Sequence, residues 1–539
     1  MKKIAKFLIV LGMMGQLSSC DYLDIVPDER AQESDTWKTE GVVRGYLYSC
    51  YGYLPANRTF GNSYWLAEEL TAVTKELFTT FKYGYYSPVS LGFTSNTWST
   101  IWNGIHQCYM FQESLKQVSN EYVTDEMKKQ YLAESNFLIA YYHFLSMRSY
   151  GPTMIIRSVI DLETPISGFP ERSSIDEVVA FINEKLDEAM SEGGLPTTWS
   201  GKDYGRATRL AALALKSRVY LYAASPLYNG NTEMYADFRS PLDGRQLIAQ
   251  EKSQAKWEIS ATQTKYAIDE VEKAKFHLYH DADAGEPSDA KPGLPNKAQR
   301  RLRYTNIDNQ TGNNPEIIWA DTRNDDYYGI QRRCPPRQTL GGKFAGISMT
   351  NCPTLQTIEA FYTKNGLPIN KDKTFDYDER YEYINAPENC DGNNYEDLVK
   401  YANFTPSSDK VMRLCTDREP RFYAWTTYHN GYFEFGKYNN EEISADPAKR
   451  AIRIHLLRDD PHGRGNRTDQ EYSISGFGNK KGVVPSAEWN VIEYPFPLFR
   501  LAELYLNYAE ALVELDRLSE AKVYLDKVRE RAGIPSVDE

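Results

Sequence analysis

Hydrophobic positions recur at helical spacing in several blocks of the chain, and polar stretches separate these blocks. Breaks rich in Gly and Pro end some of them, as at Gly151-Pro152 and Gly193-Gly194. Ser174 stands directly before one block, in a favourable N-cap position. The pattern predicts helices over Thr39–Tyr53, Trp98–Val118, Thr124–Tyr150, Ser174–Met190, Arg206–Ser225, Ala255–Ala274, Phe499–Leu515 and Ser519–Ala532.

Six of these helices can be read as three antiparallel pairs, in the manner of tetratricopeptide repeats. In such repeats small residues lie where two helices approach closely, and large residues fill the seam. Ala509 and Ala521 fall on the small positions of the last pair, and Tyr505, Tyr508 and Leu512 fall on large positions. An ordinary helical hairpin remains the alternative for any single pair. The predicted pairs are Thr124–Tyr150 with Ser174–Met190, Arg206–Ser225 with Ala255–Ala274, and Phe499–Leu515 with Ser519–Ala532.

The pattern changes between about residues 276 and 495, where Pro, Gly, Asn, Asp and Tyr dominate. Short extended runs are predicted at Glu316–Ala320 and Arg421–Thr427. A loop-rich region of this length is normally functional or disordered, and its dispersed aromatic residues argue against disorder. The predicted fold class is mainly α, with a tetratricopeptide-like helical-repeat scaffold that carries a large, irregular, loop-rich subdomain containing short strands.

The first residues resemble a bacterial export signal. Three lysines precede a short apolar run, which ends in Leu17-Ser18-Ser19-Cys20. A cysteine in this position indicates a lipoprotein, cleaved before Cys20 and lipidated on its thiol; a plain secretory signal is the alternative. No later run approaches 18 apolar residues. The expected divisions are a lipoprotein signal peptide at 1–19, an N-terminal helical region at 20–275, and the loop-rich subdomain with a C-terminal helical repeat at 276–539.

Charge and composition exclude some partners. The chain has 62 basic and 74 acidic residues, a net charge of −12, and loss of the three leader lysines leaves 59 and 74, a net charge of −15. Nucleic acid is therefore not expected as a partner, because phosphate contacts need a basic surface. The 40 tyrosines exceed what a core needs, and tyrosine also serves wet binding surfaces. The sequence leaves open whether the cysteines pair: Cys50, Cys108, Cys334, Cys352, Cys390 and Cys415.

No catalytic motif stands out. The chain has no HExxH, no phosphate-binding GxxxxGK[ST] and no GxSxG. His277 and His280, with Asp281 and Asp283, fit an exposed polar loop better than a metal site. We therefore predict no catalytic residue, no metal site and no cofactor, and the sequence leaves open whether a metal is bound. Carboxylates are plentiful, so a glycosidase acid/base pair stays open as an alternative, although nothing marks any two of them.

Two aromatic clusters form the better candidate for a ligand site. Each lies in a predicted loop and combines tyrosines with glycine, and arginines follow the second. Tyrosine rings stack on the apolar face of a sugar, while polar side chains bond its hydroxyls, which is the usual build of a small-ligand site. Packing in the core is the alternative for each ring. The predicted ligand-binding residues are Phe81, Tyr83, Tyr85 and Tyr86 in the first cluster, and Tyr327, Tyr328 and Arg332 in the second.

Short motifs are spread over almost the whole chain and are specific in their order, although each is modest singly. They are Cys20–Asp24, Ile101–Ile105, Asn136–Phe144 leading to Tyr150-Gly151-Pro152, Gly205–Thr208, Pro315–Trp319, Arg418–Phe422 and Arg500–Ala511. Together they resemble the SusD/RagB family of outer-membrane nutrient-binding lipoproteins. Within Asn136–Phe144 the sequence departs from the family pattern, because Ile139 stands where the pattern has arginine.

The resemblance implies a lipid-anchored, outward-facing protein of the outer membrane that is not an enzyme. It implies an oligosaccharide ligand and a partner, a SusC-like TonB-dependent outer-membrane transporter to which the ligand is delivered. A lid of the same type for peptides or glycopeptides is one alternative, and a secreted glycosidase is another. The family continues beyond the Arg531–Pro535 motif, so the sequence resembles a truncated member, whose last repeat would leave its hydrophobic face exposed.

Overall fold

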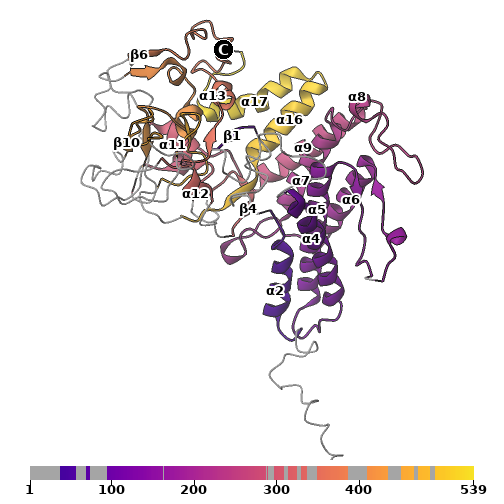
Figure 1. Ribbon diagram of the computed structural model, residues 1–539. Coiled ribbons are helices and arrows are strands. Elements are labelled where there is room, and N and C mark those ends of the chain that lie inside the picture. Colours follow the sequence, from indigo (N-terminus) through magenta and orange to yellow (C-terminus); the bar gives the residue numbers. More distant parts are fainter. Residues whose placement is uncertain are drawn as a thin grey trace, which may run out of the picture.

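The computed structural model describes residues 37–55, 68–72, 94–161, 163–286, 288, 296–308, 314–323, 329–336, 349–385, 410–434, 451–465, 472–485 and 492–538. Helices dominate this part of the chain and its strands are short, which confirms the predicted mainly α fold class (Figure 1). The long helices are α2 (Glu40–Tyr51), α4 (Thr94–Leu115), α5 (Asp125–Tyr150), α6 (Ile175–Ala189), α7 (Arg209–Ala224), α9 (Gln254–Lys273), α16 (Leu501–Glu514) and α17 (Leu518–Ala532).

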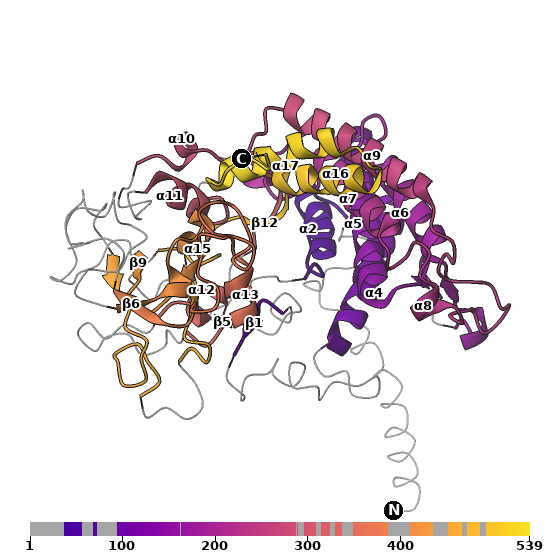
Figure 2. The same cartoon turned by 90° about the horizontal axis from the view of Figure 1, so that it is seen from above.

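The long helices stack one beside the next in a single array. Helix α4 packs between α2 and α5, and the predicted pairs α5–α6, α7–α9 and α16–α17 are all confirmed as packed neighbours. Helix α16 also packs on α9, which ends more than 200 residues earlier in the chain. The last pair therefore extends the array formed by the N-terminal helices (Figures 1 and 2). Stacking of this kind buries a continuous core in which each unit contacts mainly its neighbours.

Local sequence signals set several helix ends. The Ser174 hydroxyl accepts the amide N–H of Glu177 at 3.3 Å, which confirms the predicted N-cap, and the Glu177 carboxylate accepts the amide N–H of Ser174 at 2.7 Å, which completes a capping box. Helix α4 begins at Thr94, four residues before the predicted start at Trp98. Its first turn, Thr94–Thr97, has no hydrophobic position, so periodicity could not reveal it.

The seam of the last pair has the predicted small and large positions. Ala509 and Ala521 are buried, and the ring of Tyr524 meets those of Tyr505 at 5.7 Å and Tyr508 at 4.8 Å. These tyrosines are therefore packing residues. The outer side of the pair carries apolar side chains that are about half exposed: Leu506, Val513, Leu518 and Val523.

A strand pair connects the loop-rich subdomain to the core of the helical array. Strand β4 (Ile317–Asp321) pairs antiparallel with β12 (Phe496–Arg500), which leads directly into α16. The buried ring of Trp319 meets Phe137 at 5.0 Å and Tyr141 at 5.2 Å, edge to face, and lies 5.8 Å from Phe499. Both halves of this pair thus contribute to the main core.

The motif Ile101–Ile105 has a packing role. A Cβ atom added at Gly104 would lie 2.7 Å from the buried ring of Tyr142, whose hydroxyl donates to the Cys50 carbonyl at 2.6 Å. No larger residue fits there without moving the ring, so glycine lets α4 approach α5 closely.

The remaining elements of the described chain are short. The other antiparallel strand pairs are β1 (Leu70–Thr71) with β5 (Cys352–Pro353), β2 (Thr153–Met154) with β3 (Arg172–Ser173), β6 (Tyr383–Asn385) with β7 (Lys410–Met412), β8 (Thr426–Thr427) with β11 (Gly478–Asn479), and β9 (Tyr432–Glu434) with β10 (Ala451–Arg453). The short helices are α8 (Thr232–Tyr235), α10 (Asp281–Ala284), α11 (Lys297–Tyr304), α12 (Ile330–Arg333), α13 (Leu355–Ala360) and α15 (Pro420–Trp425), with 3₁₀ turns at Ile166–Gly168, Gly201–Asp203 and Arg413–Cys415.

The extended run predicted at Arg421–Thr427 is wrong for most of its length. Residues Pro420–Trp425 form helix α15, and only Thr426 and Thr427 are extended. Proline at the first helical position favours a helix start, and burial of Phe422 and Tyr423 in a local core outweighs their strand preference.

Five of the six cysteines that follow Cys20 form no disulfide and are buried: Cys50, Cys108, Cys334, Cys352 and Cys415. Cys390 lies outside the described residues. The open question about these five cysteines is therefore resolved in favour of packed thiols, which behave as small hydrophobic residues.

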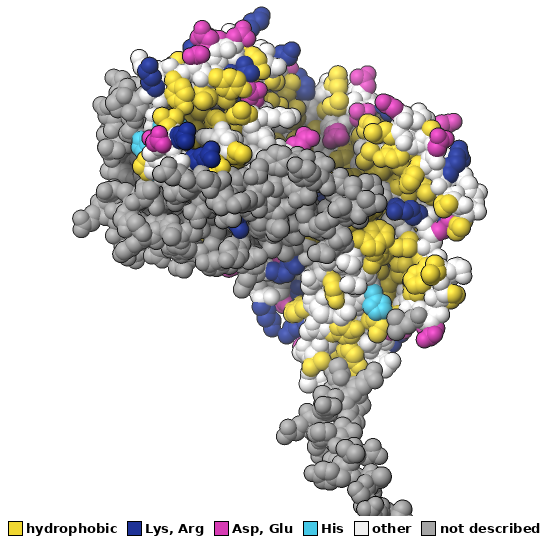
Figure 3. Space-filling model, viewed as in Figure 1, with side chains coloured by type: hydrophobic (Ala, Val, Ile, Leu, Met, Phe, Trp, Pro, Cys, Tyr) yellow, Lys and Arg dark blue, Asp and Glu magenta, His cyan; other side chains and the backbone are white. Residues whose placement is uncertain are grey.

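The described surface has mixed charge. On the face shown in Figure 3, Lys and Arg side chains alternate with Asp and Glu side chains, and no broad basic patch appears among the described residues. Within the described part of the chain, no helix is long and apolar enough to cross a membrane.

Candidate ligand-binding site

The predicted ligand residues mostly fall outside the described part of the chain. This holds for Phe81, Tyr83, Tyr85, Tyr86, Tyr327 and Tyr328, and also for the lipidation residue Cys20. The backbone of Arg332 lies in helix α12. The structure therefore shows where the two aromatic segments are attached, and their binding role stays a prediction.

One end of each segment is attached at the same small ladder. The first segment follows β1, where Leu70 pairs with Pro353 and Thr71 with Cys352. The second segment precedes α12, whose last residue, Arg333, accepts the amide N–H of Asn351 at 3.0 Å. Since Asn351 directly precedes β5, the strand β5 links β1 and α12. The segments that contain Tyr85 and Tyr327 thus emerge at neighbouring points, although about 240 residues separate them in sequence.

The other end of the second segment lies beside the helical scaffold. Arg323 is the last described residue before this segment, and its guanidinium donates to the carbonyls of Leu54 at 2.8 Å and Pro55 at 2.9 Å. Both carbonyls follow the end of α2, which packs on α4. The first segment ends at the start of α4. The described residues at the ends of both aromatic segments therefore belong to the same two places, the β1–β5–α12 ladder and the α2–α4 corner.

An aromatic cluster at the start of α4 was not predicted as part of the site. The ring of Trp98 meets Trp102 at 5.3 Å and Tyr150 at 4.8 Å, both edge to face, and all three side chains are half-buried. The indole N–H of Trp102 is buried and has no acceptor among the described residues. The available signal was the spacing of Trp98 and Trp102, which are four apart and so lie on one helix face.

A lysine of lowered pKa lies near the ladder. Burial, reinforced by the charges of Arg500 and Arg421, lowers the pKa of Lys481 to about 8, while Glu69, the residue before β1, opposes this shift. The Lys481 ammonium stands 4.7 Å from the ring centre of Trp425.

Buried carboxylates are held by cations. The Glu134 carboxylate accepts from Arg206 at 2.5 and 3.2 Å and from the Tyr51 hydroxyl at 2.7 Å. Burial raises the pKa of Glu134 in spite of Arg206, but the side chain has no exposed surface and cannot reach a substrate. Glu434 pairs with Lys480 at 3.2 Å in the same manner. These pairs support the fold and do not resemble the open acid/base pair of a glycosidase.

His143 is also structural. Its Nδ1–H donates to the Ile139 carbonyl at 2.7 Å, and its Nε2 accepts the amide N–H of Ile156 at 3.3 Å. Burial lowers the pKa of His143 to about 4. The neutral ring therefore uses both nitrogens inside the core.

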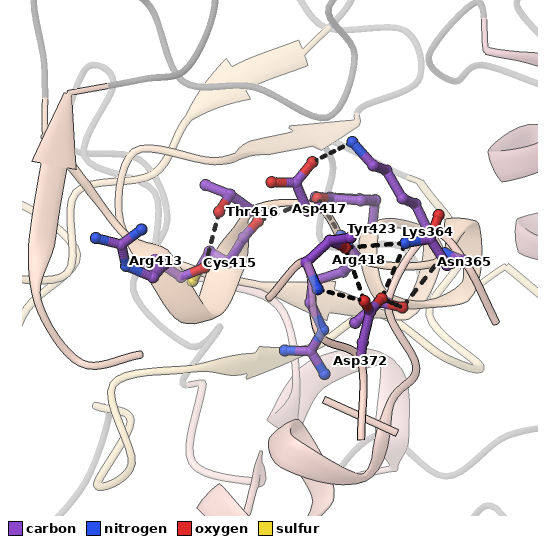
Figure 4. Close-up of polar contacts among 11 residues, drawn as sticks. Lys364, Asn365, Asp372, Arg413, Cys415, Thr416, Asp417, Arg418 and Tyr423 are labelled. Atoms are coloured by element: carbon purple, nitrogen blue, oxygen red, sulfur yellow. Dashed lines mark hydrogen bonds and ion pairs between the residues drawn. The ribbon is translucent and has the colours of Figure 1, made fainter. Parts of the chain in front are cut away.

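The family-like run Arg418–Phe422 lies in a hydrogen-bond cluster around Arg418 in the loop-rich subdomain (Figure 4). The guanidinium of Arg418 is 2% exposed and donates to the carbonyls of Leu414, Ile358 and Phe361 at 2.6–2.7 Å. The backbone N–H of Arg418 donates to the hydroxyl of Tyr423 at 3.2 Å. These bonds satisfy buried carbonyls that no secondary structure serves, so this motif organises the subdomain and is not a ligand site.

Asp372, in the same hydrogen-bond cluster, is expected to make the free energy of unfolding fall as the pH becomes acidic. Burial alone raises its pKa, but hydrogen bonds from Thr363, Thr374 and Asn365 outweigh burial and lower the pKa to about 2. A folded-state pKa below the unfolded value of about 3.9 stabilises the fold above that pH, and the contribution is lost as pH falls towards 2. Asp372→Asn should therefore cost about 1–2 kcal/mol of unfolding free energy at pH 7 and almost nothing near pH 2.

Urea titrations at both pH values measure this difference. Asp417→Asn is the matched control, because Asp417 is half-exposed in the same hydrogen-bond cluster and its carboxylate pairs with Lys364 on the surface; its cost should stay below about 0.5 kcal/mol at either pH. An Asp372→Asn cost that does not change with pH would contradict the assignment.

Comparison with known proteins supports the class that this architecture defines. A model of the SusD family matches residues 315–539, and a model described as "Starch-binding associating with outer membrane" matches residues 21–221. A search among curated proteins found no match. The helical array with its loop-rich subdomain is the SusD-like architecture. The chain belongs to the SusD/RagB family.

Solved structures of the same type cover almost the whole chain. The protein BT4246 is 28% identical, with 93% of this chain and 83% of that chain covered and a TM-score of 0.75. A SusD-like protein of Bacteroides fragilis is 20% identical, with 95% and 82% covered and a TM-score of 0.65. A SusD-like carbohydrate binding protein of the same species is 18% identical, with 93% and 80% covered and a TM-score of 0.59. The last two show the shared fold.

Proposed function

We propose that the protein is a cell-surface lipoprotein that binds a nutrient oligosaccharide and delivers it to a SusC-like TonB-dependent outer-membrane transporter. Family membership supports the class, together with one neighbour titled as carbohydrate binding and a family model described as starch-binding. The leader ending in Cys20 supports anchoring in the outer membrane through lipid, with the protein facing outward.

The attachment of the two aromatic segments carries the proposal for the site. The described residues that flank the segments of Tyr85 and Tyr327 lie at one ladder and at one corner of the scaffold, which supports a single site for both segments. Stacking of several rings on sugar faces provides affinity, and Arg332 with tyrosine hydroxyls provides selectivity. Trp98 at the start of α4 extends this aromatic surface.

Capture and delivery of the oligosaccharide need binding alone, so neither a catalytic residue nor a cofactor takes part in this proposal. In this proposal the helical array faces the transporter and the loop-rich side holds the ligand. In this proposal the protein covers the transporter as a lid. A ligand that contacts both proteins binds the closed lid more tightly than the open lid and so favours closure, and the transporter then takes up the sugar.

Affinity electrophoresis tests this function. The purified chain that begins at Cys20 is run in native gels with and without a series of soluble polysaccharides, and each mixture is assayed for new reducing ends. We expect at least one polysaccharide to slow migration and none to be cleaved. Normal migration with every polysaccharide, with binding of peptides instead, would identify a peptide-binding lid. Cleavage abolished by one carboxylate substitution would identify a glycosidase.

A further inference from the structure

Three potential metal ligands converge at one end of the β9–β10 hairpin. The pairing of these strands continues past β10, because Asn430 donates its N–H to the Ile454 carbonyl at 2.6 Å and Ile454 donates to the Gly431 carbonyl at 2.9 Å. This register places His455 beside the strand end that carries His429. The amide N–H of Leu456 then donates to Nδ1 of His429 at 3.0 Å.

A turn brings a carboxylate to the two imidazoles. The Asp460 carboxylate accepts the amide N–H of Leu457 at 2.9 Å, which points it back towards the hairpin. Its Oδ2 lies 3.5 Å from Nδ1 of His429. The ligand atoms of His429, His455 and Asp460 all lie within 4.8 Å of one another, and all three residues are half-buried.

These separations suit a small transition-metal ion. Two atoms bound to one tetrahedral zinc ion at about 2.0–2.1 Å lie roughly 3.4 Å apart. The 3.5 Å between His429 and Asp460 is already close to this spacing, and the ligand atom of His455 lies within 4.8 Å of both. Zinc binding at Nδ1 of His429 replaces the hydrogen bond from Leu456, a loss of about 1 kcal/mol.

The surroundings hold the ligands in place. His455 donates its backbone N–H to Nδ1 of the buried His462 at 3.0 Å, and the His462 ring stacks beside His455 at 6.3 Å. The ring of Tyr383 from strand β6 lies 6.4 Å from His429, edge to face. Support of this kind orients ligands before an ion arrives.

We propose that His429, His455 and Asp460 bind a divalent transition-metal ion, with zinc as the first candidate and water in the fourth position. Two imidazoles and one carboxylate favour zinc over calcium or magnesium, which need oxygen ligands. The ion joins the segment before β9 to the segment after β10. The site is independent of the glycan proposal, and its ligand spacing fits no sequence motif.

Calorimetric titration of the chelator-treated chain with zinc chloride tests the site, with calcium chloride titrated in parallel. We expect one zinc ion per chain and a melting temperature that rises with zinc. His455→Ala and Asp460→Asn should each weaken zinc binding at least about tenfold. His106→Ala is the control, because His106 is exposed on α4 in the helical array, and it should bind zinc as the wild type does.

Cobalt(II) provides a readout that does not depend on stability. A tetrahedral site gives strong visible absorption, which should vanish in His455→Ala and persist in His106→Ala. Absence of zinc binding, equal affinity in His455→Ala and wild type, or a preference for calcium would each overturn the proposal.

Discussion

Glu316→Ala is expected to lower the free energy of unfolding by about 3–5 kcal/mol. Glu316 has no exposed surface and accepts from Arg500 at 3.0 Å, from Arg531 of α17, and from the backbone N–H of Tyr279 at 2.9 Å. These bonds tie the start of β4, the end of α17 and the segment after α9 together. Without the carboxylate, Arg531 stays buried with no opposite charge, which is the costly outcome.

Urea denaturation followed by far-ultraviolet circular dichroism measures this loss. Glu258→Ala is the matched control, since Glu258 is about half exposed and pairs with Arg517 at 2.7 Å on the helical surface. Its cost should stay below about 1 kcal/mol. Glu316→Gln should fall between the two, because it removes the charge and keeps much of the shape. Similar losses for Glu316→Ala and Glu258→Ala would contradict the proposed tie.

Replacing both Tyr85 and Tyr327 with alanine is expected to weaken oligosaccharide binding about a hundredfold. Each ring provides a flat apolar face for one sugar, and loss of one such contact costs about 1–2 kcal/mol. The melting temperature should stay near the wild-type value, because in this proposal the rings serve the ligand and not the core. Titration calorimetry with one oligosaccharide and thermal unfolding measure both quantities.

Tyr266→Ala is the matched control for the tyrosine variant. Tyr266 is 44% exposed on α9 and accepts from Arg209 at 2.9 Å. Its loss should leave the affinity for the oligosaccharide unchanged. A fall in melting temperature in the double variant that matches its loss of affinity would place Tyr85 and Tyr327 in the core instead.

The helical array follows closely from the sequence. Periodicity identifies the helices because each buries one face, and Ala509, Ala521, Tyr505 and Tyr508 show the seam because small and large residues must alternate where helices touch. The capping box at Ser174 is a local signal, and the structure forms it locally. Such features depend on neighbours within a few residues.

Features that depend on distant contacts were not predictable. The sequence pattern of Arg421–Thr427 predicts a strand, but the hydrogen-bond cluster around Arg418 and the burial of Phe422 favour a helix there. The convergence of β1 and α12 depends on β5, and the sequence has no marker for that pairing. His429, His455 and Asp460 meet through a strand register and a turn, so their spacing along the chain is uninformative.

Titration of a panel of oligosaccharides into the chain that begins at Cys20, by isothermal calorimetry, tests the central claim most directly. The account predicts saturable binding of at least one oligosaccharide, with a negative heat-capacity change from burial of ring faces. The Tyr85→Ala/Tyr327→Ala variant should lose most of that heat under the same conditions. Saturable binding of peptides with no heat from any oligosaccharide would contradict the account.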